Sequence, residues 1–229
     1  MNALILTTNA GLEDCTFAEL AEATAAAGWA KGELRRGDAW LKGRLRVETP
    51  RPAADLIGLA RLLRSVHHLH RPLHQFRLDP GDPLTDIQTR CAALKLPMLG
   101  STPPFRIPSE RHGAHAFTSH DVQRAAGAGV AKSTGAPVDL TGFRVELCVD
   151  VYDDTVAVSQ RLTRRPLSHR AHWHFRPRVA LRANLAHCLL RWAGLGPGSL
   201  ALADPFCGSG TVLSEAGLWL PRLALFGSD

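Results

Sequence analysis

The chain has 229 residues, of which 45% are hydrophobic, and a formal net charge of +6. This length accommodates about one large domain or a few small ones, and the hydrophobic content is enough to form buried cores. A membrane-spanning helix needs roughly 20 apolar residues, and no run in the sequence approaches that length. The amino-terminal residues also lack a basic stretch followed by a long apolar one, the pattern of a secretion signal. We therefore expect a cytoplasmic protein without membrane contact.

The amino-terminal part alternates predicted strands and helices. Residues 4–8 are apolar and β-prone, Gly11 interrupts the pattern, and apolar residues then recur at helical spacing until Gly28. A strand-rich stretch at 39–47 follows, and a second helix is predicted after Pro52. Its buried face is expected to consist of Leu56, Ile57, Ala60, Leu63 and Val66. This order predicts a small α+β unit.

The middle of the chain is punctuated by prolines but still gives clear elements. A helix is predicted from Pro83 to about Leu94, a strand at 105–107, and a second helix begun by Ser119 with Asp121 in its first turn. The buried stripe of that second helix is predicted to be Val122, Ala126 and Val130.

Strict alternation in the sequence FRVELCVDV, followed after a turn by TVAVSQRL, predicts a β-hairpin. The residues expected on one face are Phe143, Val145, Leu147, Val149 and Val151. An apolar helix from about 178 to 192 and a short buried strand at 200–203 complete the predicted elements.

Histidines and cysteines do not indicate a metal site or a thiol nucleophile. The four histidines nearest one another are His67, His68, His70 and His74. Their spacing does not place three of them on one face with a carboxylate, so we expect them to line a helix end and a loop. The five cysteines form no C-x-x-C pair and are interpreted as small buried residues. Cys207 has no partner base at a suitable spacing and is interpreted as structural.

A basic segment separates Asp154 from Asp204, because no Asp or Glu occurs between them. Its arginines are Arg161, Arg164, Arg165, Arg170, Arg176, Arg178, Arg182 and Arg191, and the residues interleaved with them include His169, His172, Trp173, His174 and Phe175. Arginines bind phosphates and aromatic rings stack on unpaired bases, so the segment indicates contact with a nucleic acid. Trp173 is the aromatic residue expected to touch it. The alternative is a solvated basic linker.

The sequence LALADPFCGSGTVLSEAG reads as a strand, an acid, a glycine-rich turn and a helix. Nucleotide sites of α/β proteins are built in this way, with backbone amides of the turn close to the ligand. A triphosphate site is not indicated, because no lysine follows Gly208 or Gly210. A dinucleotide site is weakened by Leu213, where the fingerprint has a third glycine or alanine.

Two acids favour S-adenosylmethionine as the ligand of this turn. Asp204 ends the predicted strand, and a carboxylate there suits the sulfonium and ammonium charges of that cofactor. Asp229 ends a second apolar strand about 20 residues past the turn, where a carboxylate accepts hydrogen bonds from both ribose hydroxyls.

The sequence DPFCGSGTVLSEA resembles the first methyltransferase motif of the THUMP-containing RNA methyltransferases, and ALRANLAHCLL resembles the arginine-bearing helix that precedes it. The stretch from FRIPSERHGAHAFTSHDVQRAAGAGV to RLTRRPLSHR is similar to THUMP domains, and TTNAGLEDCTFAELAEA resembles the ferredoxin-like amino-terminal domain of the same enzymes. The resemblance covers most of the chain. Ala183 is a departure, because relatives often have proline there.

The resemblance implies an α+β fold followed by α/β: a ferredoxin-like domain at 1–70, a THUMP RNA-binding domain at 71–165, and a linker helix with the first part of a Rossmann-like methyltransferase sheet at 166–229. It implies methyl transfer from S-adenosylmethionine to RNA, typically the exocyclic amino group of a guanine in tRNA or, in relatives, large-subunit rRNA. The implied cofactor residues are Asp204, Phe206, Gly208, Gly210, Thr211, Asp229 and Arg182. The expected RNA-binding residues are Arg111, His115, Arg161, Arg164, Arg165, Arg170, Trp173 and Arg176.

Amino-group methylation in that family uses an Asn/Asp-Pro-Pro-aromatic motif after the fourth strand, which we expect beyond Asp229. The sequence TPPF at 102–105 is no substitute, because Thr102 lacks a carbonyl or carboxylate acceptor. We therefore expect this polypeptide alone to be inactive. The alternative function is an RNA-binding adaptor with a vestigial or incomplete cofactor site. A dinucleotide oxidoreductase is a third hypothesis, and Leu213 speaks against it.

Overall fold

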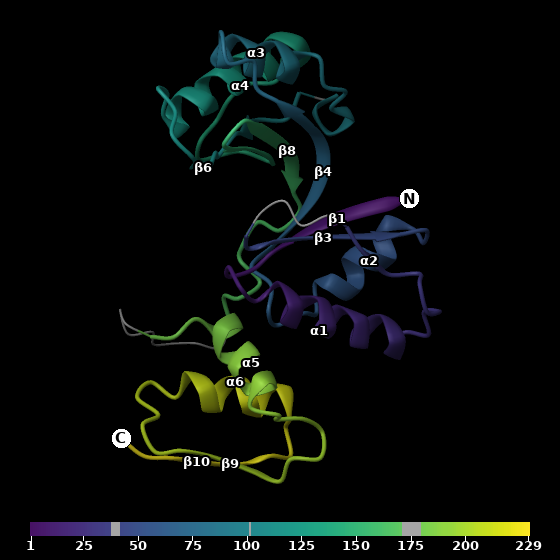
Figure 1. Cartoon of the computed structure of the whole chain (residues 1–229), viewed down its shortest axis with the longest axis vertical. Coiled ribbons are helices and arrows are strands. Elements are labelled where there is room, and N and C mark those ends of the chain that lie inside the picture. Colours follow the sequence, from purple (N-terminus) through teal and green to yellow (C-terminus); the bar gives the residue numbers. More distant parts are fainter. Residues whose placement is uncertain (38–41, 101, 171–179) are drawn as a thin grey trace. The chain divides into compact units, whose positions relative to one another are not determined.

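The computed structural model describes residues 1–37, 42–100, 102–170 and 180–229. It consists of two compact units (Figure 1). The first unit comprises residues 1–69 and 163–229, and the second comprises residues 70–162. Within the described ranges, no helix combines the length and the hydrophobicity needed to cross a membrane.

The amino-terminal part of the first unit has the ferredoxin-like order of elements. They are β1 (Asn2–Thr7), α1 (Glu13–Ala26), β2 (Arg35–Arg36), β3 (Arg44–Thr49), α2 (Ala53–Ala60) and the start of β4 (His68–Arg77). The strands follow the order β2-β3-β1-β4, and β1 pairs antiparallel with β3, with Leu4 opposite Val47. Alternate strand residues face α1 and α2, which bury Leu4, Leu6 and Leu45 almost completely. The predicted α+β unit is confirmed.

The second helix is shorter than the sequence indicates. Helix α2 ends at Ala60, and Leu63 and Val66 are buried in the segment that follows it. The backbone amides of Arg64 and Ser65 donate hydrogen bonds of 2.8 and 3.1 Å to the Glu19 carboxylate on α1. A side chain distant in sequence thus satisfies these amides outside a helix, which local periodicity does not reveal.

The prediction of a loop around the clustered histidines is wrong. His68, His70 and His74 lie in the ten-residue strand β4, which pairs antiparallel with β8 (Thr155–Arg161). The register shifts between Pro72 and His74, and a proline, which has no N–H to donate, is tolerated at such an irregularity. The polar composition and the proline conceal this strand in the sequence.

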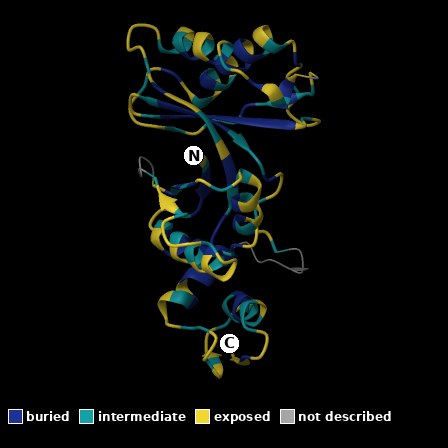
Figure 2. Cartoon of the chain, turned by 90° about the vertical axis from the view of Figure 1, so that its right-hand side faces the viewer, coloured by how far each residue is buried: buried dark blue, intermediate teal, exposed yellow. Residues whose placement is uncertain are grey.

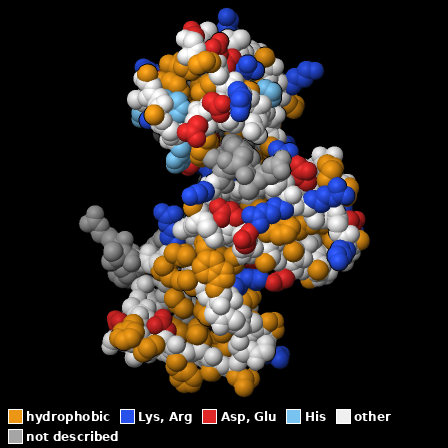
Figure 3. All heavy atoms as spheres, in the orientation of Figure 1, with side chains coloured by type: hydrophobic (Ala, Val, Ile, Leu, Met, Phe, Trp, Pro, Cys, Tyr) orange, Lys and Arg blue, Asp and Glu red, His pale blue; other side chains and the backbone are white. Residues whose placement is uncertain are grey.

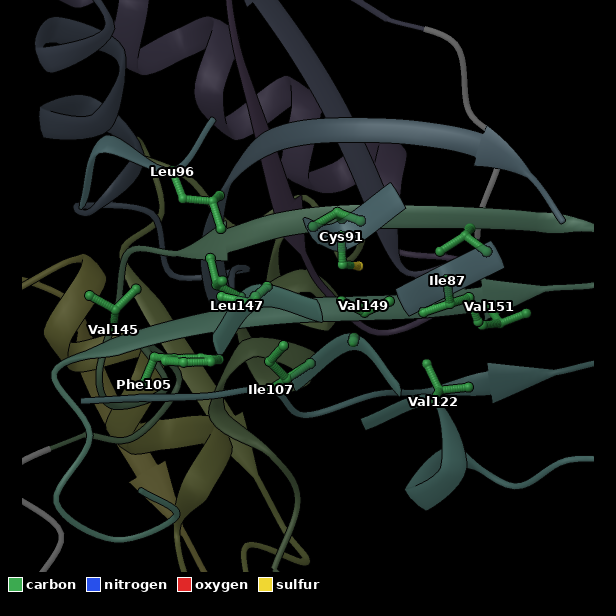
Figure 4. Close-up of a cluster of buried hydrophobic side chains, with 14 of the residues drawn as sticks. Ile87, Cys91, Leu96, Phe105, Ile107, Val122, Val145, Leu147, Val149 and Val151 are labelled. Carbon is green, nitrogen blue, oxygen red and sulfur yellow. The ribbon is translucent and has the colours of Figure 1, made fainter. Parts of the chain in front are cut away.

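The second unit packs two helices on one face of its sheet. Its further elements are α3 (Pro83–Ala92), the short 3-10 helix η1 (Pro97–Leu99), β5 (Phe105–Arg106), β6 (Arg111–His112), α4 (Ser119–Thr134) and β7 (Val145–Tyr152). The strand order is β4-β8-β7-β5, and β6 also pairs with β7. Figure 4 shows residues of β7 and of the helices meeting in the core, among them Leu147, Val149 and Ile87.

The predictions of helix α4 and of the β7–β8 hairpin in the second unit are confirmed in most details. Thr118 caps α4 in a reciprocal box with Asp121, and the predicted stripe of three residues is buried. The hairpin strands β7 and β8 pair antiparallel around a turn in which Asp153 has a φ of 50°. Phe143, however, lies before β7 and is only partly buried.

The carboxy-terminal part of the first unit is a two-stranded parallel sheet with helices. Its elements are α5 (Ala183–Trp192), β9 (Ala201–Asp204), α6 (Thr211–Trp219) and β10 (Ala224–Gly227). Leu190, Ala216 and Leu223 form its small core. The predicted buried strand is in fact exposed at Ala201 and Ala203, and every residue of β10 is exposed (Figure 2). Leu200 and Phe226 are therefore exposed here. Figure 3 shows hydrophobic side chains at the surface of this part of the chain.

Candidate cofactor site and nucleic-acid surfaces

The turn between β9 and α6 places an acid at the end of a strand and a glycine at the start of a helix. The Asp204 Oδ1 atom accepts a hydrogen bond of 3.1 Å from the Phe206 amide, which fixes the direction of the chain as it leaves β9. Gly210 precedes α6 with a φ of 70°, and the Gly208 φ is 48°. Both angles lie in the left-handed region that favours glycine, so the turn depends on these two residues.

The end of the second strand closes on the same turn. Strand β10 is parallel to β9, with Gly227 opposite Asp204, so both strands end at the same edge. The Gly208 amide donates a 3.3 Å hydrogen bond to Asp229 Oδ1, and the Cys207 amide donates one of 3.0 Å to the Ser228 carbonyl. The two predicted carboxylates, Asp204 and Asp229, are thus brought together on either side of the glycine turn.

Leu213 has a packing role that explains why the helix does not need a third glycine. A Cβ atom added at Gly227 would lie 2.6 Å from Leu213 Cδ1 and 3.1 Å from Cys207 Sγ. The close approach of helix and strand is therefore provided by a glycine on β10, while the helix carries the larger side chain. Cys207 lies against the strand, where it contributes to packing of the turn.

The turn combines carboxylates with backbone donors and lacks a lysine. Thr211, the first residue of α6, is buried, and its hydroxyl lies 3.1 Å from that of Ser209. Phe206 is exposed beside the turn. Such an edge suits a polar nucleoside that carries positive charge, because an anionic phosphate would face Asp204 without a counter-ion.

Arg182 immediately precedes α5, and its charge acts on His67. Its predicted role at the cofactor stays a prediction. Burial, together with the charges of Arg182 and Arg44, lowers the pKa of His67 to about 4. The two ring nitrogens of His67 lie 2.6 Å from Asn9 Oδ1 and 2.7 Å from Ser168 Oγ.

Beneath the turn, α6 carries a buried acid that the sequence analysis did not single out. Glu215 is 0% exposed, and its carboxylate oxygens accept hydrogen bonds of 2.7 and 2.9 Å from the Arg170 guanidinium. Arg64, which follows α2, lies 3.4 Å from the same carboxylate. Arg170 also donates to the carbonyls of Leu167 and Arg64. The Arg170 guanidinium, predicted to bind RNA, thus anchors α6 to the amino-terminal part of the unit.

The second unit gathers aromatic and basic side chains around β6, of which His112 is exposed and Arg111, His115 and Tyr152 are half-buried. The His112 ring stacks on Tyr152, with centroids 4.8 Å apart and planes 12° apart. Arg111 donates to the Gly113 carbonyl at 2.9 Å, and its Nη1 atom lies 3.0 Å from His115 Nδ1. His115 Nε2 is 2.7 Å from the Asp153 carbonyl oxygen. The RNA-binding candidates Arg111 and His115 therefore brace a loop that supports the His112–Tyr152 stack.

The remaining RNA-binding candidates fall into three groups. Arg161 forms an ion pair with the buried carboxylate of Glu146. Arg164 and Arg165 are exposed after β8. Trp173 and Arg176 lie outside the described residues.

Comparison with known families gives two matches in this chain. Residues 84–160 match the THUMP domain, and residues 170–227 match the RMKL-like methyltransferase domain, UPF0020. The chain is 36% identical over 228 residues to the tRNA (guanine(6)-N2)-methyltransferase of Thermus thermophilus, a match over 97% of this chain and 63% of that protein. The chain thus carries a THUMP domain match followed by a methyltransferase domain match, the combination that the resemblance to THUMP-containing methyltransferases implies.

Further relatives agree with this placement of the THUMP-containing chain. The crystal structure of TrmN from Thermus thermophilus superposes with a TM-score of 0.74 at 34% identity, covering 100% of this chain and 65% of that one. The human tRNA (guanine(6)-N(2))-methyltransferase THUMP3 is 35% identical over 112 residues, which are 48% of this chain and 22% of that protein. A predicted N6-adenine-specific DNA methylase from Listeria monocytogenes shares the fold, with a TM-score of 0.73 at 20% identity. The chain spans less than two thirds of the length of these relatives.

Proposed function

We propose that this THUMP-containing chain belongs to an enzyme that transfers the methyl group of S-adenosylmethionine to the exocyclic amino group of a guanine in tRNA. The observation that carries the proposal is the placement of Asp204 and Asp229 at one edge of a parallel sheet, where amides of the same glycine turn donate to both carboxylates, Phe206 to Asp204 and Gly208 to Asp229. The likeness to a Thermus tRNA (guanine(6)-N2)-methyltransferase over 97% of the chain supports the substrate and the atom that is methylated.

The residues of the turn fit this cofactor. Bound S-adenosylmethionine supplies a methyl group made electrophilic by the sulfonium charge. Asp204 would offset the positive charge of the cofactor, Asp229 would accept hydrogen bonds from its ribose hydroxyls, and the turn at Gly208 and Gly210 would let backbone amides approach it. Phe206, exposed beside the turn, offers a ring against which an adenine can pack.

The second unit supplies the support for RNA binding in this proposal. A stacked imidazole and phenol present an aromatic face, and Arg111 lies on the same loop. Unpaired bases stack on such faces without a sequence requirement, while arginines hold phosphates. We therefore place the RNA contact of this unit at the loop 111–115 and at Tyr152.

The proposal is tested by two binding measurements on the full chain. Isothermal titration with S-adenosylmethionine should detect one site, and Asp229→Asn should weaken it by about 10-fold, the loss of a charge-assisted hydrogen bond. Asp55→Asn is the matched control, because Asp55 is exposed on α2. Binding of NAD at this site in place of S-adenosylmethionine would contradict the proposal.

Electrophoretic mobility shift with an unmodified tRNA transcript tests the RNA partner. The chain should bind the transcript, and the affinity should fall as salt rises because phosphate contacts release counter-ions. Binding of tRNA without any binding of the cofactor would instead support an RNA-binding adaptor.

A further inference from the structure

Two buried cysteines from distant parts of the sequence lie together in the first unit. Cys15 is on α1 and Cys188 is on α5, and the two pack with Leu12 and Leu185 in one hydrophobic cluster. Cys15 is 6% exposed and Cys188 is 0% exposed, and both are free thiols. The two helices that carry them contact each other. The fold therefore brings two thiols that are 173 positions apart in the sequence into one small buried cluster.

A cation and a cavity lie next to this pair. Arg191 follows Cys188 on α5 by three residues, so both side chains lie on the same face of the helix. Arg191 and Cys15 line a surface cavity of about 660 Å³, together with Ala18, Trp192 and Trp219. A small uncharged oxidant can thus reach Cys15 from solvent, whereas Cys188 lies behind it.

The environment makes the two thiols unequal. The hydrogen bond from Cys188 lowers the pKa of Cys15 against the opposing effect of burial, and the charge of Arg191 lowers it further. The same hydrogen bond and burial raise the pKa of Cys188. Cys91 in the second unit offers a contrast, because burial alone raises its pKa to about 12. A thiolate reacts with oxidants and a thiol does not, so Cys15 is the nucleophile and Cys188 the resolving partner.

We propose that Cys15 and Cys188 are a redox pair that a hydroperoxide converts to a disulfide between α1 and α5. The Cys15 sulfur attacks the hydroperoxide, forming an S–O bond while the O–O bond breaks, and an alcohol or water leaves with the proton. The Cys188 sulfur then attacks the sulfenic acid, forming the S–S bond, and a second water leaves. Two thiols are oxidised and one hydroperoxide is reduced. Both side chains already pack in the same cluster, so the two sulfur atoms meet without rearrangement of the helices.

The disulfide would join α1 covalently to α5, the helix that precedes β9. Helix α5 also packs on α6, which begins directly after the glycine turn at 205–210. Covalent attachment of Cys188 to α1 would therefore restrict the elements next to that turn. This inference does not depend on which cofactor or RNA the chain binds.

Peptide mapping of the full chain after treatment with hydrogen peroxide tests the proposal. The Cys207→Ser background removes the half-buried cysteine of the turn, and digestion by trypsin gives Cys15 in peptide 1–31 and Cys188 in peptide 183–191. These two peptides should become linked, and dithiothreitol should release them. In the added variant Cys188→Ala, Cys15 should instead be trapped by dimedone as the sulfenic acid.

Cys91→Ser is the matched control, since it removes a buried cysteine of the second unit. This variant should form the link between Cys15 and Cys188 at an unchanged rate. In the chain that retains Cys91, the Cys91 thiol should react with peroxide at least about 10-fold more slowly than Cys15. The primary measurement needs no substitution at either member of the pair, so a folding defect cannot imitate the result. Peptides 1–31 and 183–191 that stay unlinked while other cysteines are oxidised would overturn the proposal.

Discussion

The substitution Glu215→Gln tests the buried charge cluster that Glu215 on α6 forms with Arg170 and Arg64. Glutamine keeps nearly the same volume, so the change removes a charge without opening a cavity. Glu215 is 0% exposed, and its carboxylate accepts two hydrogen bonds from Arg170, at 2.7 and 2.9 Å. The Arg64 guanidinium lies 3.4 Å from the same carboxylate. Breaking a buried pair costs about 3–5 kcal/mol because the partner charge is left without compensation. Both arginines keep some access to water, so we expect a loss of about 3 kcal/mol in the free energy of unfolding.

Tryptophan fluorescence during urea unfolding measures this loss in the first unit, to which Glu215 belongs. The sequence has no tryptophan at 70–162, and Trp29, Trp192 and Trp219 lie in the described part of the first unit, so tryptophan emission reports on unfolding of that unit. The control is Asp14→Asn, since the Asp14 side chain is 87% exposed in its pair with Arg36, and it should change the free energy of unfolding by less than about 1 kcal/mol. A loss below about 1 kcal/mol for Glu215→Gln would refute the reasoning, because water would then be solvating the cluster.

Three further predictions follow from the same structure. Burial raises the pKa of Glu19, but hydrogen bonds from His187 and from the Arg64 amide outweigh it and lower this pKa from 4.5 to about 2. The stability that the Glu19 carboxylate contributes is therefore complete above pH 4.5 and lost as the pH falls toward 2. Urea unfolding of the chain and of Glu19→Gln across that range should converge at the acid end, and parallel curves would contradict the assignment. Gly227→Ala should weaken S-adenosylmethionine binding, since the new Cβ would lie 2.6 Å from Leu213 Cδ1. The control Gly196→Ala should leave binding unchanged, because a Cβ there meets open space. Equal titration curves for the two variants would argue against the packing role of Gly227. His112→Ala should lower tRNA affinity by about 10-fold, because a stacking contact with a base is lost. His120, exposed at the start of α4, gives the control His120→Ala. An unchanged mobility shift for His112→Ala would show that the His112–Tyr152 stack does not contact RNA.

Local patterns predicted the parts of this chain whose geometry is set by neighbours in sequence. The turn after Asp204 is one such part, because a strand, two glycines in the left-handed region and a helix start follow from residues close together. The register of β9 and β10 then places Asp229 beside it. Helix α4 is a second example, since Thr118 and Asp121 form its cap within one turn.

The features that the sequence did not reveal depend on contacts between distant segments. Arg170 belongs to a basic run that indicates nucleic-acid contact, yet its partner Glu215 is far along the chain and sits in an apolar helix. Likewise, α2 ends early because Glu19 binds the amides of Arg64 and Ser65. The strand β4 is concealed because its polar residues and Pro72 do not alternate as a half-buried strand does. Such pairings have no local signature.

Photo-crosslinking tests the central claim, that the turn between Asp204 and Asp229 holds S-adenosylmethionine, most directly. The chain is irradiated with tritiated cofactor and digested with trypsin, which gives the turn in peptide 192–222 and the end of β10 in peptide 223–229. The label should appear in these peptides, disappear with excess S-adenosylhomocysteine, and fall in Asp204→Asn. Label located in another peptide, or unaffected by the competitor, would contradict the account.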